Sequence, residues 1–532
     1  MKIITHKNNL NHWVFWPPFL VLLFAIIISF LNKDAFATAM NNGYAWVSHW
    51  FDWLYLLLGL AFVVLAAIIL CTKAGNLKFG GAEAKPQYTF YQWFAMSLCG
   101  GIAIGIIFWG VAEPIQFLAE PNNGIKPFSP DAVLFSISQV YMHWSFTPYA
   151  LYTVATIPIA LAVYNYNQKM TISSGLYFIM GDKCHGKFGN IVDAICLFAL
   201  VSGMASGMGL GIMQIASGLE FATGLQPSTL IWALIAIFIV IAFTFSGALG
   251  IDKGLKWLSD QNLKLYIMVL IFLLVVGPTA FILKLGVEGL GIFITTFFAK
   301  STFLGAATGE DWSRWWTVFY WAMWIVYAPV VGIFLTRLCY GRTVRQFLVV
   351  NLIAPAIFGI IWFTIFGATA INMQLTGIHD LWNTLQTSGL ESAVFTFFQQ
   401  MPFGTFLVFL FLVIIIISFI TMADSMTSVA AIMSTSGFSQ EDKEPSTILK
   451  IIWGSIIGFM AWIMISFAGI DGARMLTVLA SLPLLFIMIA LFISTIKGLY
   501  APETKLYIKK EKRISEQKMN NIRKTVLDML NI

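Results

Sequence analysis

An uncharged stretch of this sequence carries aromatic rings where most apolar helices carry leucine. It reads FYWAMWIVYAP, residues 319–329. Tyr320, Trp324 and Tyr327 follow one another at spacings of four and three residues, which places their rings on one face of a helix. The rings lie too deep in the apolar run to belong to the aromatic belt at a membrane surface. The pattern therefore indicates an internal aromatic face.

A second aromatic group occurs in HWSFTPYALY, residues 143–152. Trp144, Tyr149 and Tyr152 are five and three residues apart, so we expect them to share one side of a helix. Pro148 lies between them, and a membrane helix tolerates proline only where neighbours satisfy the freed carbonyl. The sequence thus predicts two aromatic faces in one protein.

Aromatic faces of this kind can bind a cation. The negative face of a ring attracts a positive charge by about 2 kcal/mol or more when both are desolvated. A quaternary ammonium group suits such a site because it has no N–H donor and needs no acceptor. Ordinary helix packing is the better explanation for any single ring, but two faces together favour a cage around a cation.

Glycines are concentrated in LCGGIAIGIIFWGVAEP, residues 98–114. Gly100, Gly101 and Gly105 each weaken a helix relative to alanine. Gly101 and Gly105 have the GxxxG spacing that allows close helix packing. A discontinuous helix, whose free backbone groups would bind ions, is the alternative. The glycines alone leave both explanations open.

The composition identifies the class of protein that must position these residues. Of 532 residues, 59% are hydrophobic and only 11% are charged, with a mean hydropathy of +0.82. A water-soluble domain could not bury so much apolar surface, whereas repeated runs of about 20 apolar residues can cross a bilayer. We therefore expect an all-α membrane protein. The five cysteines and six histidines show no metal-binding or haem-binding spacing, and the net charge of +6 is not read as a nucleic-acid signal.

Twelve membrane-spanning helices are expected, with both termini in the cytoplasm of a cell (inner) membrane. The positive-inside rule supports this orientation because most lysines and arginines fall on one side. The exceptions are Lys33, Lys126, Lys284, Lys300, Arg314 and Arg474. The expected spans are 14–31, 52–71, 90–112, 136–162, 190–218, 228–247, 264–286, 315–338, 347–372, 403–434, 449–468 and 473–496.

These motifs together resemble the betaine/choline/carnitine transporter family. WTVFYWAMWIVYAP at 316–329 is followed by FLTRLCYGRTVRQF at 334–347, and GRTVR beside the tryptophan-rich helix is highly specific. GGIAIG, FWGVAEP, the HW motif, GMGLGIMQI at 207–215 and TMADSMTS at 421–428 occur in the family's order. The resemblance covers about residues 14–500 and implies a neurotransmitter-sodium-symporter-like fold.

The implied organisation has two peripheral helices and two inverted repeats of five helices. Its parts are a cytoplasmic N-terminus (1–13), the peripheral helices (14–89), the first repeat (90–286), an external loop with an amphipathic helix near 288–300 (287–314), the second repeat (315–497) and a basic cytoplasmic tail (498–532). Members of the family are commonly trimers, so a homotrimer in contact with membrane lipid is the implied assembly.

The resemblance also implies which residues bind substrate. The aromatic box would comprise Trp144, Tyr149, Tyr152 and Trp324, bordered by Tyr327 and Phe108, with Trp321 and Met323 in the same motif. Backbone of Gly100, Gly101, Ile102, Ala103 and Gly105 would help receive a substrate carboxylate. The chain departs from the family at Ala103, where glycine is usual, and at Tyr149 and Met323, where tryptophan is common.

Ion coupling is where the sequence departs furthest. Sodium-coupled members carry two adjacent hydroxyl residues where this chain has Thr421 and Met422, and threonines where it has Leu200 and Met204. Sodium-independent exchangers carry an arginine in place of Asn262. Full sodium coupling is therefore disfavoured, and sodium or a proton stays open as the coupling ion, with no other cofactor expected.

Two charged side chains near the same region are ambiguous. Asp424 is an intramembrane acid that could bind a proton or an ion, or could have a purely structural role. Lys264 could supply the missing charge, although extension to the cytoplasmic surface is the simpler expectation.

Three arginines in the loop before residue 347, Arg337, Arg342 and Arg345, would form a gate or interface with the cytoplasmic tail, although a cytoplasmic loop requires positive charge in any case. The predicted function is a secondary transporter of a quaternary ammonium compound such as glycine betaine, choline or carnitine. The alternatives are an amino-acid or amine transporter of the same fold and a sodium-independent exchanger of precursor and product. An enzyme or a sensor is disfavoured, because no cluster of catalytic side chains and no sizeable soluble domain is evident.

Overall fold

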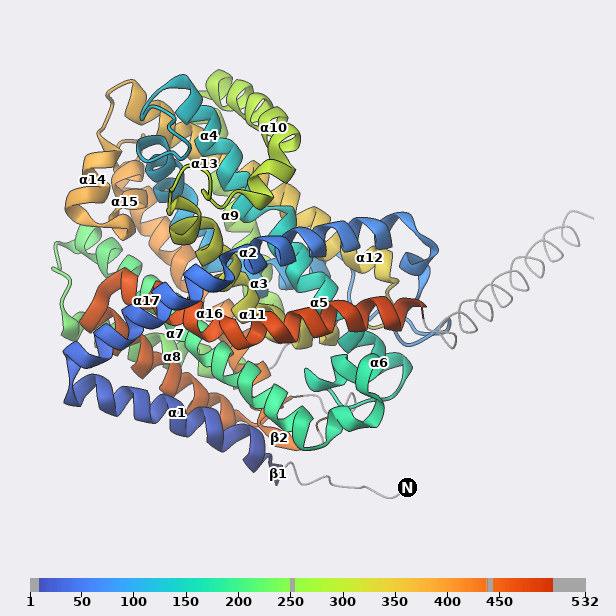
Figure 1. Ribbon diagram of the computed structural model, residues 1–532. Helices are drawn as coiled ribbons and strands as arrows, with labels where there is room; N and C mark the ends of the chain where they lie inside the picture. The colour runs from blue at the N-terminus through green and yellow to red at the C-terminus, as the bar shows by residue number, and fades with distance from the viewer. Residues whose placement is uncertain (1–8, 249–253, 437, 439–443, 501–532) are drawn as a thin grey trace, which may run out of the picture.

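The chain is an all-helical multi-pass membrane protein, in agreement with the class expected from its composition. The computed structural model describes residues 9–248, 254–436, 438 and 444–500. Within that part the strands are β1 (Asn9–Leu10) and β2 (Thr435–Ser436), which pair antiparallel. Figure 1 shows the helical bundle, with α2 and the C-terminal part of α17 crossing its near face.

The long helices account for most of the described residues. They are α1 (His12–Leu31), α2 (Lys33–Cys71), α3 (Phe90–Ala119), α4 (Pro130–Trp144), α5 (Phe146–Asn165), α7 (Lys187–Thr223), α8 (Thr229–Ala248), α9 (Lys256–Val276), α10 (Thr279–Thr302), α11 (Phe319–Cys339), α13 (Ala354–Leu375), α16 (Gly404–Met433) and α17 (Thr447–Tyr500). Shorter helices are α6 (Tyr177–Met180), α12 (Val344–Leu348), α14 (Leu381–Ser388) and α15 (Ala393–Gln399). Short 3-10 helices are η1 (Lys73–Asn76), η2 (Ser173–Leu176), η3 (Gly181–His185) and η7 (Leu390–Ser392), and π-helical turns are η5 (Arg314–Val318) and η6 (Val349–Ile353).

Among the described residues, twelve helical segments are long and apolar enough to cross a membrane, or thirteen if the two halves of the bent α3 are counted as one span. The prediction for 264–286 was wrong at its end, because α9 stops at Val276. Pro278 follows, and a proline after a helix end cannot extend the hydrogen-bond ladder. Residues 288–300 belong to the longer α10, which is among the candidate spans; its interfacial location stays a prediction.

Several other expected boundaries were also wrong. The N-terminal end of α2 lies at Lys33 rather than 52, where the Asn32 side chain accepts a hydrogen bond from the Ala35 N–H at 3.0 Å and caps the helix. The C-terminal end of α3 lies at Ala119 rather than 112. The helix, which contains Pro114, therefore runs through residues that were expected to form a loop. The expected loop between 372 and 403 contains α14 and α15.

The expected helix 136–162 is interrupted in its middle. Ser145, with φ −123° and ψ −115°, separates α4 from α5. Pro148 consequently lies in the first turn of α5, where backbone N–H groups lack intrahelical acceptors and proline costs little. Trp144 therefore ends one helix while Tyr149 and Tyr152 start the next, and the predicted single aromatic face is two faces.

The two expected spans 449–468 and 473–496 lie within one assigned helix, α17, which contains two candidate spans. The described helices that surround the bundle interior pack in pairs: α11 against α5, α3 against α13 and α16, and α7 against α17. Most residues of α11 are buried. A Cβ atom added at Gly203 of α7 would lie 2.3 Å from Val326 Cγ1, so this glycine lets α7 and α11 approach closely.

Candidate functional site

Trp324 of α11 is the centre of a buried aromatic cluster. Its ring centroid lies 5.4 Å from that of Trp144, 5.8 Å from that of Tyr149 and 5.2 Å from that of Tyr152. All three neighbours meet Trp324 edge to face, an arrangement that aromatic pairs prefer. The break at Ser145 thus turns α4 and α5 so that both present rings to α11.

A small internal cavity adjoins this cluster, with a volume of about 50 Å³. It is lined by Gly105, Phe108, Trp109, Trp144, Tyr152, Gly207, Leu210, Met323, Trp324, Tyr327 and Met422. A liquid water molecule occupies about 30 Å³, so the cavity would hold one or two waters. A trimethylammonium group therefore fits only after the rings move apart.

The cavity includes most residues expected to bind substrate, with two exceptions. Tyr149 touches Trp324 but does not line the cavity. Trp321 is also buried elsewhere: a Cβ added at Gly59 of α2 would lie 3.3 Å from its indole nitrogen. Leu210 and Met422 also line the cavity but were not predicted to bind substrate: Leu210 belongs to the motif at 207–215, and Met422 was considered only as an ion-coupling candidate.

Close packing accounts for two of the glycines in α3. A Cβ atom at Gly105 would lie 2.6 Å from Cη2 of Trp144, and one at Gly100 would lie 2.6 Å from Cε1 of Phe334. The two halves of the helix, Phe90–Gly100 and Gly105–Ala119, are also bent by 62°. The side chains of 101–104, including those of Ile102 and Ala103, lie outside the described part of the structure.

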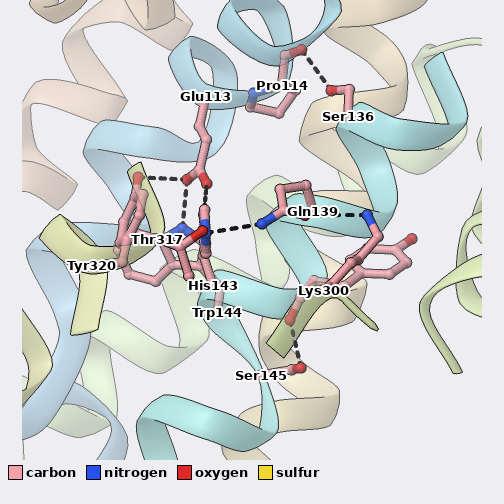
Figure 2. A network of polar contacts seen from close by, with 11 residues as sticks. Glu113, Pro114, Ser136, Gln139, His143, Trp144, Ser145, Lys300, Thr317 and Tyr320 are labelled. Atoms are coloured by element: carbon pink, nitrogen blue, oxygen red, sulfur yellow. Dashed lines mark hydrogen bonds and ion pairs between the residues drawn. The ribbon is translucent and has the colours of Figure 1, made fainter. Parts of the chain in front are cut away.

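A buried carboxylate, Glu113, lies directly behind the aromatic cluster (Figure 2). Its Oε2 accepts hydrogen bonds from Trp144 Nε1 at 2.6 Å and from the Tyr320 hydroxyl at 2.7 Å, and its Oε1 lies 2.7 Å from His143 Nδ1. An intramembrane acid is a functional signal by default. Sequence reasoning missed Glu113 because residues after 112 were expected to form an external loop.

The candidate ion-coupling residues make mainly structural contacts. The Thr421 hydroxyl donates to the carbonyl of Ile417 at 2.7 Å. Asn262 donates to the Ser418 hydroxyl at 3.0 Å and to the Tyr266 hydroxyl at 3.2 Å. In the described part of the chain, no three His, Cys, Asp or Glu side chains are grouped as metal ligands.

Lys264 does not supply a charge to this region, because its side chain is 58% exposed and its Nζ lies 2.6 Å from Asp260 Oδ2. A different lysine does reach the region of the candidate ion-coupling residues. The buried Lys450 places Nζ 3.8 Å from Oδ1 of Asp424, whose Oδ2 accepts from Ser246 at 2.9 Å. A buried acid with a cationic partner has a structural explanation.

The three loop arginines contact two different regions of the chain. Arg337 Nη2 lies 3.9 Å from Oε2 of Glu444, which is also 3.9 Å from Nζ of Lys450. Arg342 donates to the Tyr88 carbonyl, and Arg345 donates to the carbonyls of Leu70 and Thr72. Arg342 and Arg345 thus tie the start of α12 to the segment joining α2 and α3, while the tail beyond 500 lies outside the described residues.

Two buried donors in the aromatic cluster have no hydrogen-bond partner among the described residues. They are Nε1 of Trp324 and the hydroxyl of Tyr149. An unpaired buried donor costs about 1–3 kcal/mol, so such a group is usually retained where a ligand or water accepts its hydrogen bond. Their presence favours an acceptor at this site when it is in use.

Comparison with known proteins gives a consistent family. The family described as BCCT, betaine/carnitine/choline family transporter, matches residues 13–504. The glycine betaine transporter OpuD of Bacillus subtilis (strain 168) is 30% identical over 513 residues, covering 96% of this chain and 98% of the relative. The ectoine/hydroxyectoine transporter of Virgibacillus pantothenticus is 30% identical over 512 residues, covering 95% and 100%. The osmo-dependent choline transporter BetT2 of Acinetobacter baylyi is 30% identical over 499 residues, covering 93% and 72%.

Proposed function

The chain belongs to the betaine/carnitine/choline transporter family and is a transporter rather than an enzyme; from this premise we propose that it carries a quaternary ammonium compound, held among Trp144, Tyr152 and Trp324. The single observation that supports this most is the cavity lined by those rings in the interior of the bundle. Names of relatives include glycine betaine, choline and ectoine transporters.

The rings can replace water around the substrate's cationic head. Each face contributes about 2 kcal/mol when desolvated, so two or three faces together contribute about 4–6 kcal/mol toward the lost hydration. Met422 and Met323 add polarizable sulfur to the cavity lining. Neither sulfur demands a hydrogen bond, which suits a head group that has no donors.

The unpaired donors favour a substrate that also has a carboxylate. Trp324 Nε1 could donate to a carboxylate oxygen in the cavity, whereas the Tyr149 hydroxyl could do so only once its ring moves to the cavity. Choline lacks a carboxylate and would leave these buried donors dependent on water or on its single hydroxyl. The proposal therefore ranks a betaine-type zwitterion above choline.

Alternating access around this cavity is the proposed mechanism, with the expected two inverted repeats moving relative to each other. Arg337, Glu444 and Lys450 form a chain of ion pairs to Asp424, which lies inside α16. In this proposal, breaking and reforming these ion pairs opens one side of the pathway. The homotrimer, the repeat boundaries and the orientation of the termini belong to the same proposal.

Binding to purified protein tests the substrate. Tryptophan fluorescence should be quenched by glycine betaine at lower concentration than by choline, because Trp324 lines the cavity and its free Nε1 can donate to a carboxylate. Proline serves as the competing amine substrate without a quaternary head. Quenching by proline alone would favour an amino-acid transporter of this fold and would contradict the proposal.

Sodium should matter less here than in a sodium-coupled relative. Sodium needs oxygen ligands, but the residue next to Thr421 is Met422, whose thioether is a poor ligand for a hard cation. Removing a coupling ligand usually changes an affinity by roughly 5- to 150-fold, and we expect less than about fivefold from sodium removal. Uptake into proteoliposomes would be measured with sodium, with a proton gradient, or with substrate inside. Complete loss of uptake without sodium would show that a sodium site exists.

A further inference from the structure

Glu113 belongs to a hydrogen-bonded chain that runs from the aromatic cluster to a surface cavity, which we call the Lys300 vestibule. The vestibule has a volume of about 430 Å³, and its lining includes Asn123, Asp131, Gln139, Lys300 and Thr317. Asn123 is exposed, so the vestibule opens at the protein surface. Gln139 and Thr317 both contact His143 Nε2, at 3.1 and 3.2 Å (Figure 2).

The donors and acceptors in this chain have one consistent direction. Lys300 can only donate, so at 3.2 Å it fixes the oxygen of the Gln139 amide as the acceptor. The Gln139 NH₂ group then donates to His143 Nε2, which places the imidazole proton on Nδ1. Nδ1–H donates to Glu113 Oε1. The directions of these hydrogen bonds, starting at Lys300, therefore require a neutral His143 and an ionised Glu113.

One imidazole nitrogen, Nε2 of His143, remains an acceptor next to the vestibule. A proton from vestibule water can be added there if the Gln139 amide rotates and presents its oxygen instead; Lys300 then gives up that oxygen and keeps the Ser138 hydroxyl as its acceptor at 2.7 Å. The net charge of the Glu113–His143 pair then changes from −1 to 0, and both side chains keep hydrogen-bond partners. Burial normally forbids such a change of charge, but here the new His143 Nε2–H can donate to the Gln139 oxygen or to the Thr317 hydroxyl, which lies 3.2 Å away.

We infer that Glu113 and His143 form a proton-binding site that exchanges protons through the Lys300 vestibule and is coupled to the substrate site through Trp144. The inference rests on the proposed function, since it concerns the same cavity. The indole of Trp144 donates to Glu113 at 2.6 Å and lines the substrate cavity. A cationic head beside Trp144 therefore favours the unprotonated pair, and substrate binding releases a proton.

Other charged and titratable groups near the Glu113–His143 pair also affect its electrostatic energy. The Tyr320 hydroxyl of α11 donates to Glu113. Lys300 of α10 reaches the pair through Gln139. From α17, the Arg474 guanidinium lies 4.8 Å from the ring of Trp316 and 5.8 Å from that of Trp109, which lines the substrate cavity. These cations lower the electrostatic cost of an ionised Glu113.

The strength of the coupling follows from distance. Opposite unit charges roughly 8 Å apart, about the width of one indole, change an affinity roughly 30-fold at an effective dielectric constant of about 20. Choline should show the full effect, because it is a cation without a compensating carboxylate. Glycine betaine should show a smaller effect, because its own carboxylate opposes the field of its head.

Calorimetric titration of the purified transporter, in two buffers with different heats of ionisation, counts the protons released per substrate bound. We expect a release of up to one proton at mildly acidic pH, reduced to none in Glu113→Gln, which should still bind substrate roughly 10- to 30-fold more weakly. Glu120→Gln is the matched control, because Glu120 follows the last residue of the same helix and bonds Gln116. It should behave like the wild type.

Infrared difference spectra between acidic and mildly alkaline pH test the site without substrate. A carboxylate or imidazole signal that Glu113→Gln removes and Glu120→Gln retains would support the inference. Equal heats in both buffers at every pH, with substrate bound by the wild type, would overturn it while leaving the proposed substrate standing. Loss of proton release in Asp424→Asn but not in Glu113→Gln would overturn it as well.

Discussion

Replacing Trp324 by leucine is expected to reduce the affinity for substrate by about 30-fold or more. Trp324 is the ring that Trp144, Tyr149 and Tyr152 all contact, and it lines the cavity itself. Losing one desolvated face costs about 2 kcal/mol, and the three neighbouring rings would also lose their common support. Uptake of labelled betaine at a low, fixed concentration would fall by a similar factor.

Trp257→Leu provides the comparison for that experiment. Trp257 lies in α9 and its side chain is 61% exposed, so its removal alters the total tryptophan content without touching the cavity. Because the Trp324→Leu substitution itself removes a fluorescent side chain, the affinity should be measured by calorimetry and by uptake rather than by quenching. An unchanged affinity in Trp324→Leu would place the substrate elsewhere and would refute the aromatic box.

Replacing Gly105 by alanine is expected to lower transport by at least tenfold. The added Cβ would lie 2.6 Å from Cη2 of Trp144, closer than Cβ contacts occur. The other edge of the indole is held by Glu113, and its face stacks on Phe363 at a centroid distance of 5.4 Å, so a shift away from the new Cβ disturbs both contacts. Overpacking of this kind costs about 1–3 kcal/mol, and here it also displaces a ring of the cavity.

Gly291→Ala separates this steric effect from the general effect of alanine in a helix. Gly291 lies in α10, and an added Cβ would meet no atom within 4 Å. Alanine there should leave uptake unchanged and slightly stabilise the helix, by up to about 1 kcal/mol. Thermal unfolding of both variants would show whether Gly105→Ala loses transport by misfolding. A variant that is as stable and as active as Gly291→Ala would contradict the packing argument.

Local pattern was sufficient for the class of protein and for the aromatic character of its interior. Apolar runs are local properties of a chain, and a bilayer requires them wherever it is crossed. The spacing of Trp324 and Tyr327 within one helix likewise needs no tertiary information. Helix ends were less predictable: the break at Ser145 depends on a conformation that no residue type requires, and α2 extends through residues of mixed polarity.

The polar connections between helices were decided by tertiary structure alone. Glu113 and His143 lie 30 residues apart, and His143 and Thr317 lie 174 apart. Met422 likewise enters the cavity only because α16 packs beside α3 and α7. Periodicity tells which side of a helix is buried, but the partner that a buried carboxylate finds depends on the rotation and depth of every neighbouring helix. The sequence by itself therefore predicted most of the rings that line the cavity, and the packing of the helices placed an acid and an imidazole behind them.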